Sequence, residues 1–121
     1  GVLLLAQMSS SENLLDNNYS HRTIGMGSAS PHVIGYIGNG SSPDSLASLR
    51  EMVGEGKMIW TPGINIDVEK GVLGQRYGHP TDAVRAGSDA VIVGSGIHGA
   101  EDPLAAASEY AEASWISLLE R

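Results

Sequence analysis

Four short apolar runs divide this chain of 121 residues into units of similar length. They span residues 2–6, 33–37, 58–60 and 90–93. Their starts lie roughly 30 residues apart, which is the length of one strand–helix–strand unit. Each run is continuously apolar rather than alternating, as expected for parallel strands covered on both faces. The pattern predicts a β-α-β-α-β-α-β-α order with a parallel sheet and right-handed crossovers.

Two of the intervening segments carry clear helix boundaries. Ser42 is a good N-cap, Pro43 suits the first helical position, and Gly54 ends the apolar stripe that follows. Residues 80–86 indicate a shorter helix that is closed by Gly87.

The first and last segments differ in how clearly they predict a helix. Residues 11–30 contain paired asparagines and two glycines, so we expect at most a weak or short helix there. Asp102 and Pro103 open a final helix, whose apolar stripe is expected to face the core. The stripe consists of Leu104, Ala107, Ala111, Trp115 and Leu118.

A parallel sheet of this size has two unpaired edges, which invite pairing with more chain. An eight-stranded βα barrel needs roughly 250 residues, about twice this length. The predicted fold class is therefore α/β, a parallel (βα)4 half of a TIM-type (βα)8 barrel, with residues 1–121 as one domain. The start at Gly1, directly inside a strand-like run, suggests a fragment. We expect an N-terminal half-barrel or a second copy, as in a homodimer, to cover the edges.

Charge and composition exclude several kinds of partner. Seven basic against fourteen acidic residues make a formal charge of −7, which argues against nucleic-acid and anionic membrane surfaces. The absence of Cys rules out disulfides and thiolate metal sites, and the four histidines lack a metal-binding spacing. The apolar start is too short to span a membrane. We expect a cytoplasmic protein without a metal ion.

Polar and glycine-rich segments follow three of the predicted strands. Ser9 lies in a run of three serines after the first strand, and Pro62 and Gly63 follow the third. Gly94, Ser95 and Gly96 follow the fourth. Each segment by itself also fits an ordinary turn, and the serines fit a solvated N-cap cluster. Because phosphate sites of barrels lie at the carboxyl ends of the strands, the agreement of the last two loops favours a phosphate-binding face.

The loop after the third strand is longer than a βα connection needs, which favours a binding loop. It closes on Gln75 and Tyr77. An amide can bridge a ligand carbonyl and a phosphate, and a phenol can donate to a phosphate oxygen.

Several motifs match a known family in order along the chain. They are LLLAQMSS at 3–10, VIGYI at 33–37, TPGI at 61–64, GQRY at 74–77, GSDAVIVGSGI at 87–97 and EYAEASW at 109–115. The chain resembles, from end to end, the C-terminal half of orotidine 5′-phosphate decarboxylase, which converts OMP to UMP. The family's strand five usually reads LLxAEMSS and its strand eight GSDIIIVGRGI.

The resemblance implies a role for each strand-end residue. Ser9 would contact the pyrimidine and Pro62 would pack beside the base. Gln75 would bridge base and phosphate, and Tyr77 would bond the phosphate. The backbone of Gly94, Ser95 and Gly96 would cradle it. The family works without metal or cofactor, so the implied partner is a nucleotide monophosphate.

Three departures limit what this chain can do. The family's catalytic D-x-K-x-x-D motif is missing and neither Lys57 nor Lys70 replaces it, so we assign no catalytic residue to this chain. The family's phosphate-binding arginine falls at Ser95, and Gln7 stands where glutamate is usual.

Two other functional hypotheses stay open. One is a non-catalytic or engineered half-barrel whose role is folding or assembly, with weak phosphate binding. The other is a different phosphate-binding barrel of the same superfamily, such as a sugar-phosphate lyase, against which the GQxY spacing argues.

Overall fold

The computed structural model describes residues 1–10, 13–67 and 76–121. Its four strands form one sheet in chain order: β1 Val2–Leu5, β2 Val33–Ile37, β3 Met58–Thr61 and β4 Ala90–Val91. Each strand pairs in parallel with the next. The predicted parallel sheet is confirmed, with β1 and β4 at its two edges.

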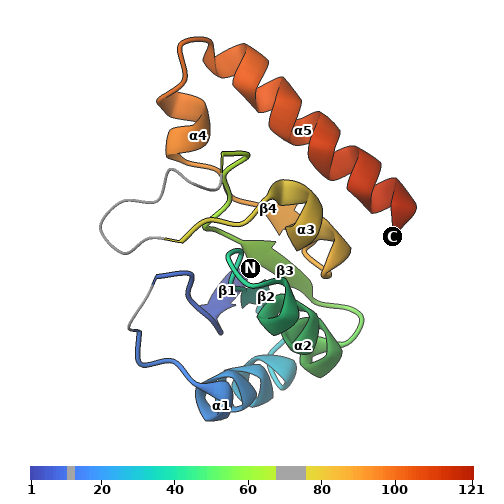
Figure 1. Ribbon diagram of the computed structural model, residues 1–121. Helices are drawn as coiled ribbons and strands as arrows, with labels where there is room; N and C mark the ends of the chain where they lie inside the picture. The colour runs from blue at the N-terminus through green and yellow to red at the C-terminus, as the bar shows by residue number, and fades with distance from the viewer. Residues whose placement is uncertain (11–12, 68–75) are drawn as a thin grey trace.

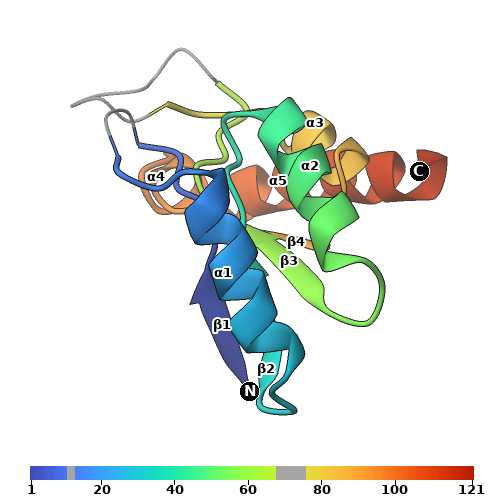
Figure 2. The same ribbon diagram turned by 90° about the horizontal axis from the view of Figure 1, so that it is seen from below.

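The helices are α1 Asn17–Ser28, α2 Pro43–Val53, α3 Pro80–Arg85, α4 Ser95–His98 and α5 Pro103–Glu120. α1, α2 and α3 follow one another along one face of the sheet, and α5 lies beyond α3 (Figure 1, and turned in Figure 2). The other face has exposed apolar side chains at Leu5, Met58 and Ile92. The fold is thus a sheet with a helical layer on one face and, within the described residues, no layer over the other.

The core lies between the sheet and its helices. Tyr36 of β2 and Ile59 of β3 pair in register and pack with Leu46 and Leu49 of α2. The Tyr36 hydroxyl donates to the Ile24 carbonyl at 3.0 Å. Burial raises the pKa of Tyr36, so this hydroxyl stays protonated and remains a donor.

The first helix is longer than the sequence predicted, with 12 residues. Asp16 caps it by accepting from the Tyr19 N–H at 2.8 Å, and the Ser20 hydroxyl donates to the Ala6 carbonyl at 2.8 Å. A Cβ at Gly27 would lie 2.3 Å from the Tyr36 hydroxyl oxygen. The glycine that lowers helix propensity here is what lets α1 approach the sheet, so tertiary packing overrides propensity.

The predicted boundaries of α2, α3 and α5 are confirmed to within one residue, whereas α4 was not predicted. Ser42 caps α2 by accepting from the Ser45 N–H, and Gly54 ends it at a positive φ of 67°. Gly87 follows α3 with φ 111°, and Asp102 caps α5. Glycine suits both helix ends because a side chain is strained at positive φ.

The prediction that the apolar stripe of α5 belongs to the core is wrong. Leu104, Trp115 and Leu118 are 79%, 61% and 42% exposed, and the buried positions of the helix are Tyr110 and Ser117. Part of the stripe borders a groove of about 200 Å³ beside β4. The stripe is uncovered because β4 is the edge of the sheet, and nothing in the described chain packs beyond it.

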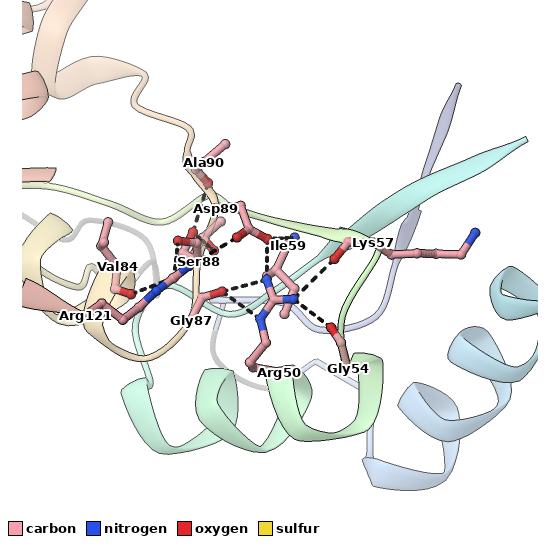
Figure 3. Close-up of polar contacts among 11 residues, drawn as sticks. Arg50, Gly54, Lys57, Ile59, Val84, Gly87, Ser88, Asp89, Ala90 and Arg121 are labelled. Carbon is pink, nitrogen blue, oxygen red and sulfur yellow. Dashed lines mark hydrogen bonds and ion pairs between the residues drawn. The ribbon is translucent and has the colours of Figure 1, made fainter. Parts of the chain in front are cut away.

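Asp89 lies at the amino end of β4 and joins several elements, as expected of a structural residue (Figure 3). Its Oδ2 accepts from the Ile59 N–H at 2.8 Å and forms an ion pair with Arg50. Arg121 lies 3.5 Å from its other oxygen. Arg50 also donates to the carbonyl of Gly87 at 2.8 and 3.0 Å. These contacts fasten α2, β3, β4 and the C-terminus together at the end of the sheet away from the polar loops.

Candidate functional site

One pocket of about 270 Å³ opens at the carboxyl ends of the strands. It gathers side chains and backbone from the segments after β1, β3 and β4: Ser9, Pro62, Gly63, Ile64, Tyr77, Ile92, Gly94 and Ser95. Five of the residues that the sequence nominated therefore share one site, namely Ser9, Pro62, Tyr77, Gly94 and Ser95. Gly96 adjoins the pocket in sequence without lining it. Gln75 lies outside the described residues.

A short backbone bridge brings Tyr77 back to the end of β3. Ile64 and Gly78 pair in parallel, with the Asn65 N–H donating to the Gly78 carbonyl at 3.0 Å. The Gly78 N–H in turn donates to the Gly63 carbonyl at 2.9 Å. Gly63 has φ 75°, which reverses the chain just after Pro62. Both ends of the long loop are thereby held at the pocket.

Gly78 must be glycine because it lies against the backbone of another loop. A Cβ there would lie 1.8 Å from the carbonyl oxygen of Gly40, which is backbone that cannot move aside. The segment carrying Tyr77 thus packs directly on the loop after β2.

The glycine turn after β4 leads straight into the four-residue helix α4. The N–H groups of Ile97 and His98 donate to the Gly94 carbonyl at 3.0 and 3.1 Å. Gly94 lines the pocket, and a Cβ there would meet nothing within 4 Å. Such a turn can present N–H groups to an anion.

Sequence reasoning missed a buried tyrosine beneath these two loops. Tyr110 of α5 donates to the Asn65 side-chain oxygen at 3.0 Å and accepts from the Ile66 N–H at 3.0 Å. Its hydroxyl also adjoins Gly96, where a Cβ would lie 2.2 Å away. Tyr110 and Asn65 are 45 positions apart, so no local pattern could have linked them.

The glutamine that departs from the family pattern makes two specific bonds. The Gln7 side-chain oxygen accepts from the Asn39 N–H at 3.0 Å, and its nitrogen donates to the Ser45 carbonyl at 2.9 Å. A glutamate could make the first bond but not the second, since an ionised carboxylate has no donor. Gln7 therefore ties the end of β1 to α2 and to the loop after β2.

Among the residues that the structure describes, no basic side chain lines the pocket. His79 instead caps α3 by accepting from the Thr81 N–H at 3.3 Å, and His98 ends α4. Arg76 and His98 do not line the pocket. A bound anion would be held here by hydroxyl and backbone N–H groups.

A larger hollow of about 550 Å³ lies around Arg50, Asp89 and Arg121 at the opposite end of the sheet. Its arginines are already engaged with Asp89 and backbone carbonyls, which marks it as structural. Within the described ranges, no group of three His, Cys, Asp or Glu could hold a metal ion. None of the helices described is both long and apolar enough to cross a membrane.

Two sequence relatives of this chain are fungal orotidine 5′-phosphate decarboxylases. The chain is 32% identical over 122 residues to orotidine 5′-phosphate decarboxylase of Penicillium nalgiovense, which covers 100% of the chain and 44% of the fungal enzyme. Identity to the Phycomyces blakesleeanus enzyme is 36% over 124 residues, with the same coverage. The chain thus spans less than half the length of these relatives.

Solved structures agree with the sequence relatives. Orotidine 5′-phosphate decarboxylase from Pyrococcus horikoshii superposes with a TM-score of 0.73 at 30% identity, covering 93% of this chain and 50% of that one. The Sulfolobus solfataricus enzyme gives 0.74 at 26% identity, covering 96% and 49%. The fold is therefore part of the TIM barrel of these enzymes.

The family model for orotidine 5′-phosphate decarboxylases and the HUMPS family matches residues 1–110. Together with the ordered strand-end motifs and the parallel sheet, this match shows that the chain belongs to the orotidine 5′-phosphate decarboxylase/HUMPS family.

Proposed function

We propose that residues 1–121 are the substrate-binding half of an orotidine 5′-phosphate decarboxylase barrel, acting in the synthesis of UMP from OMP in the cytoplasm. The observation that carries the proposal is the shared pocket at the strand ends, where Ser9, Pro62, Tyr77 and the Gly94–Ser95 turn meet. These residues come from segments that are far apart in the sequence, and each except Ser95 matches a motif of the family.

Each contact has a chemical reason in this proposal. The Ser9 hydroxyl bonds a polar edge of the pyrimidine, and Pro62 packs against the ring. The phenol of Tyr77 donates to a phosphate oxygen, with Gln75 bridging base and phosphate. Backbone N–H groups of Gly94, Ser95 and Gly96 complete the phosphate cradle. Because Ser95 stands at the family's arginine position and no cation lines the described part of the pocket, nucleotide binding is expected to be weak.

The chain does not supply the chemistry of decarboxylation. Loss of CO₂ leaves a carbanion that needs a nearby cation and a proton donor, and among the described lining residues of the pocket there is no Lys or Asp. In the proposed scheme those groups come from the other half of the barrel. Phosphate binding by the present half contributes by holding the remote end of the substrate during the step.

The missing half is the proposed partner. It would pair with the edges at β1 and β4 and cover the exposed face of the sheet. Trp60 of β3 supports this, because its indole N–H is buried and has no hydrogen-bond acceptor among the described residues. The apolar stripe of α5 would be covered at the same time. Dimerisation of the completed barrel is part of the proposal.

We expect the isolated chain to show no OMP turnover above the uncatalysed background, because it lacks the charged groups. Mixing it with the separately produced N-terminal half of a related decarboxylase should restore turnover and shift tryptophan emission to shorter wavelength as Trp60 and Trp115 are covered. The measurements are a spectrophotometric OMP assay and a fluorescence titration. Turnover by the chain alone would refute the proposal.

The second candidate is a non-catalytic half-barrel that serves folding or assembly, and Ser95 in place of the family's arginine favours it. The two candidates differ in what UMP binding requires. If the pocket is a nucleotide site, combining Tyr77→Phe with Gln75→Ala should weaken UMP binding at least about tenfold, since two hydrogen bonds to charged or polar ligand groups are lost. Isothermal titration decides between them, with Tyr19→Phe on the surface of α1 as the matched control. Unchanged binding would favour the assembly role.

A further inference from the structure

We propose that Tyr110 is a positioning residue for nucleotide phosphate: it holds the loop after β3 and the glycine turn after β4 in one fixed arrangement. This inference rests on the proposed function. It concerns a residue of α5 that lies behind the pocket and does not line it.

Tyr110 makes its bonds to one loop through a single buried oxygen. The side chain is 5% exposed and Asn65 is 7% exposed. The hydroxyl donates to the Asn65 side-chain oxygen at 3.0 Å while accepting from the Ile66 N–H at 3.0 Å. The same Asn65 oxygen also accepts from the Asp67 N–H at 3.0 Å. Two consecutive residues after the Gly63 turn, Asn65 and Ile66, are therefore fastened to α5, and Asp67 is linked to them through Asn65.

The second loop meets the same oxygen by close packing. A Cβ at Gly96 would lie 2.2 Å from the Tyr110 hydroxyl oxygen, so only glycine lets the turn sit this near. Gly96 is separated from Ser95 and Gly94 of the pocket by one and two positions. The tyrosine hydroxyl is thus the point where both pocket loops rest on the helix.

This arrangement matters because the donors among the described lining residues are hydroxyl and backbone N–H groups, which are neutral. Hydrogen bonds weaken steeply when donor and acceptor are misaligned, and backbone N–H groups cannot reorient as a long side chain can. A phosphate that must bond both Tyr77 and the glycine turn needs these two segments at a fixed separation. Tyr110 supplies the separation without touching the ligand, since it bonds Asn65 and Ile66 instead.

Tyr110→Phe removes the hydroxyl and keeps the ring that fills the core. Tyr36→Phe is the control: Tyr36 is 1% exposed, and its hydroxyl makes one 3.0 Å bond to a distant segment, the Ile24 carbonyl, away from the pocket, whereas the Tyr110 hydroxyl makes two bonds. Both variants should lose stability, the Tyr110 variant somewhat more. Only Tyr110→Phe should reduce the preference of the pocket for UMP over uridine.

The experiment is an amide NMR titration of the full chain with UMP and, separately, with uridine. We expect Tyr110→Phe to weaken UMP binding about five- to tenfold, as for the loss of one hydrogen bond to the phosphate. The affinity for uridine should stay unchanged. Tyr36→Phe should leave both affinities as in the parent chain. Asn65→Ala, which removes the acceptor of the same bond, provides a second variant should the first fail to fold, and should reproduce its effect.

The outcomes separate this inference from the proposed function. If the parent chain prefers UMP to uridine and a folded Tyr110→Phe or Asn65→Ala variant keeps the full preference, Tyr110 is not a positioning residue. A parent chain with no preference for UMP refutes the proposed function itself, and this inference with it. Equal losses of UMP affinity in the Tyr110→Phe and Tyr36→Phe variants would show a general stability effect and also overturn the inference.

Discussion

Replacing Asp89 with alanine should destabilise the chain by about 2–4 kcal/mol. The Ile59 N–H, whose residue is fully buried, would lose its acceptor, and Arg50 would lose its ion-pair partner while remaining tied to backbone carbonyls. Small domains are stable by only about 5–15 kcal/mol, so the loss is a large share of the total. Urea denaturation followed by circular dichroism measures it.

Two variants separate the causes of this loss. Asp89→Asn keeps an oxygen for the Ile59 N–H and removes the charge, so it should fall between the parent and the alanine variant. Glu120→Gln breaks the ion pair with Arg85, whose side chains are 55% and 50% exposed, and should cost at most about 0.5 kcal/mol. An alanine variant at 89 as stable as Glu120→Gln would show that the network in Figure 3 carries no structural role.

Ser95→Arg should produce the largest gain in ligand binding. Ser95 lines the pocket at the glycine turn, where the family places its phosphate-binding arginine. A charge-assisted, bidentate contact contributes about 1.5–3 kcal/mol, which corresponds to UMP binding tighter by roughly 10- to 150-fold. Isothermal titration or NMR titration with UMP measures the change.

The control for this gain is chemical as well as mutational. Uridine affinity should stay unchanged because the new guanidinium acts on the phosphate. Ser95→Gln, which adds length without charge, should gain little. The gain should also shrink as salt is raised, since an exposed ion pair is screened. Equal tightening of uridine would place the arginine outside a phosphate site.

Much of the fold could be predicted because its signals are local. Ser42, Gly54 and Gly87 mark helix ends through the backbone angles and bonds of their own neighbours. Continuous apolar runs at the βα period indicated parallel strands, and the observed sheet has that order. The strand-end residues could also be nominated, because parallel strands bring their carboxyl ends to one edge.

The two predictions that failed, for α1 and for the α5 stripe, depended on contacts between distant parts of the chain. The sequence underestimated α1, because the contact of Gly27 with Tyr36 across the core is not visible in the propensity of the segment. It assigned the α5 stripe to the core, because periodicity identifies an apolar face without identifying what covers it.

By itself, then, the sequence determined the order of the strands, the boundaries of α2, α3 and α5, the family and the residues that face the strand ends, since each of these depends on short-range chemistry or on ordered motifs. The tertiary structure alone decided that Tyr110 supports both pocket loops, that Gln7 ties β1 to its neighbours and that the α5 stripe lies at an open edge. Such contacts join residues tens of positions apart, and only the packing of the folded chain brings them together.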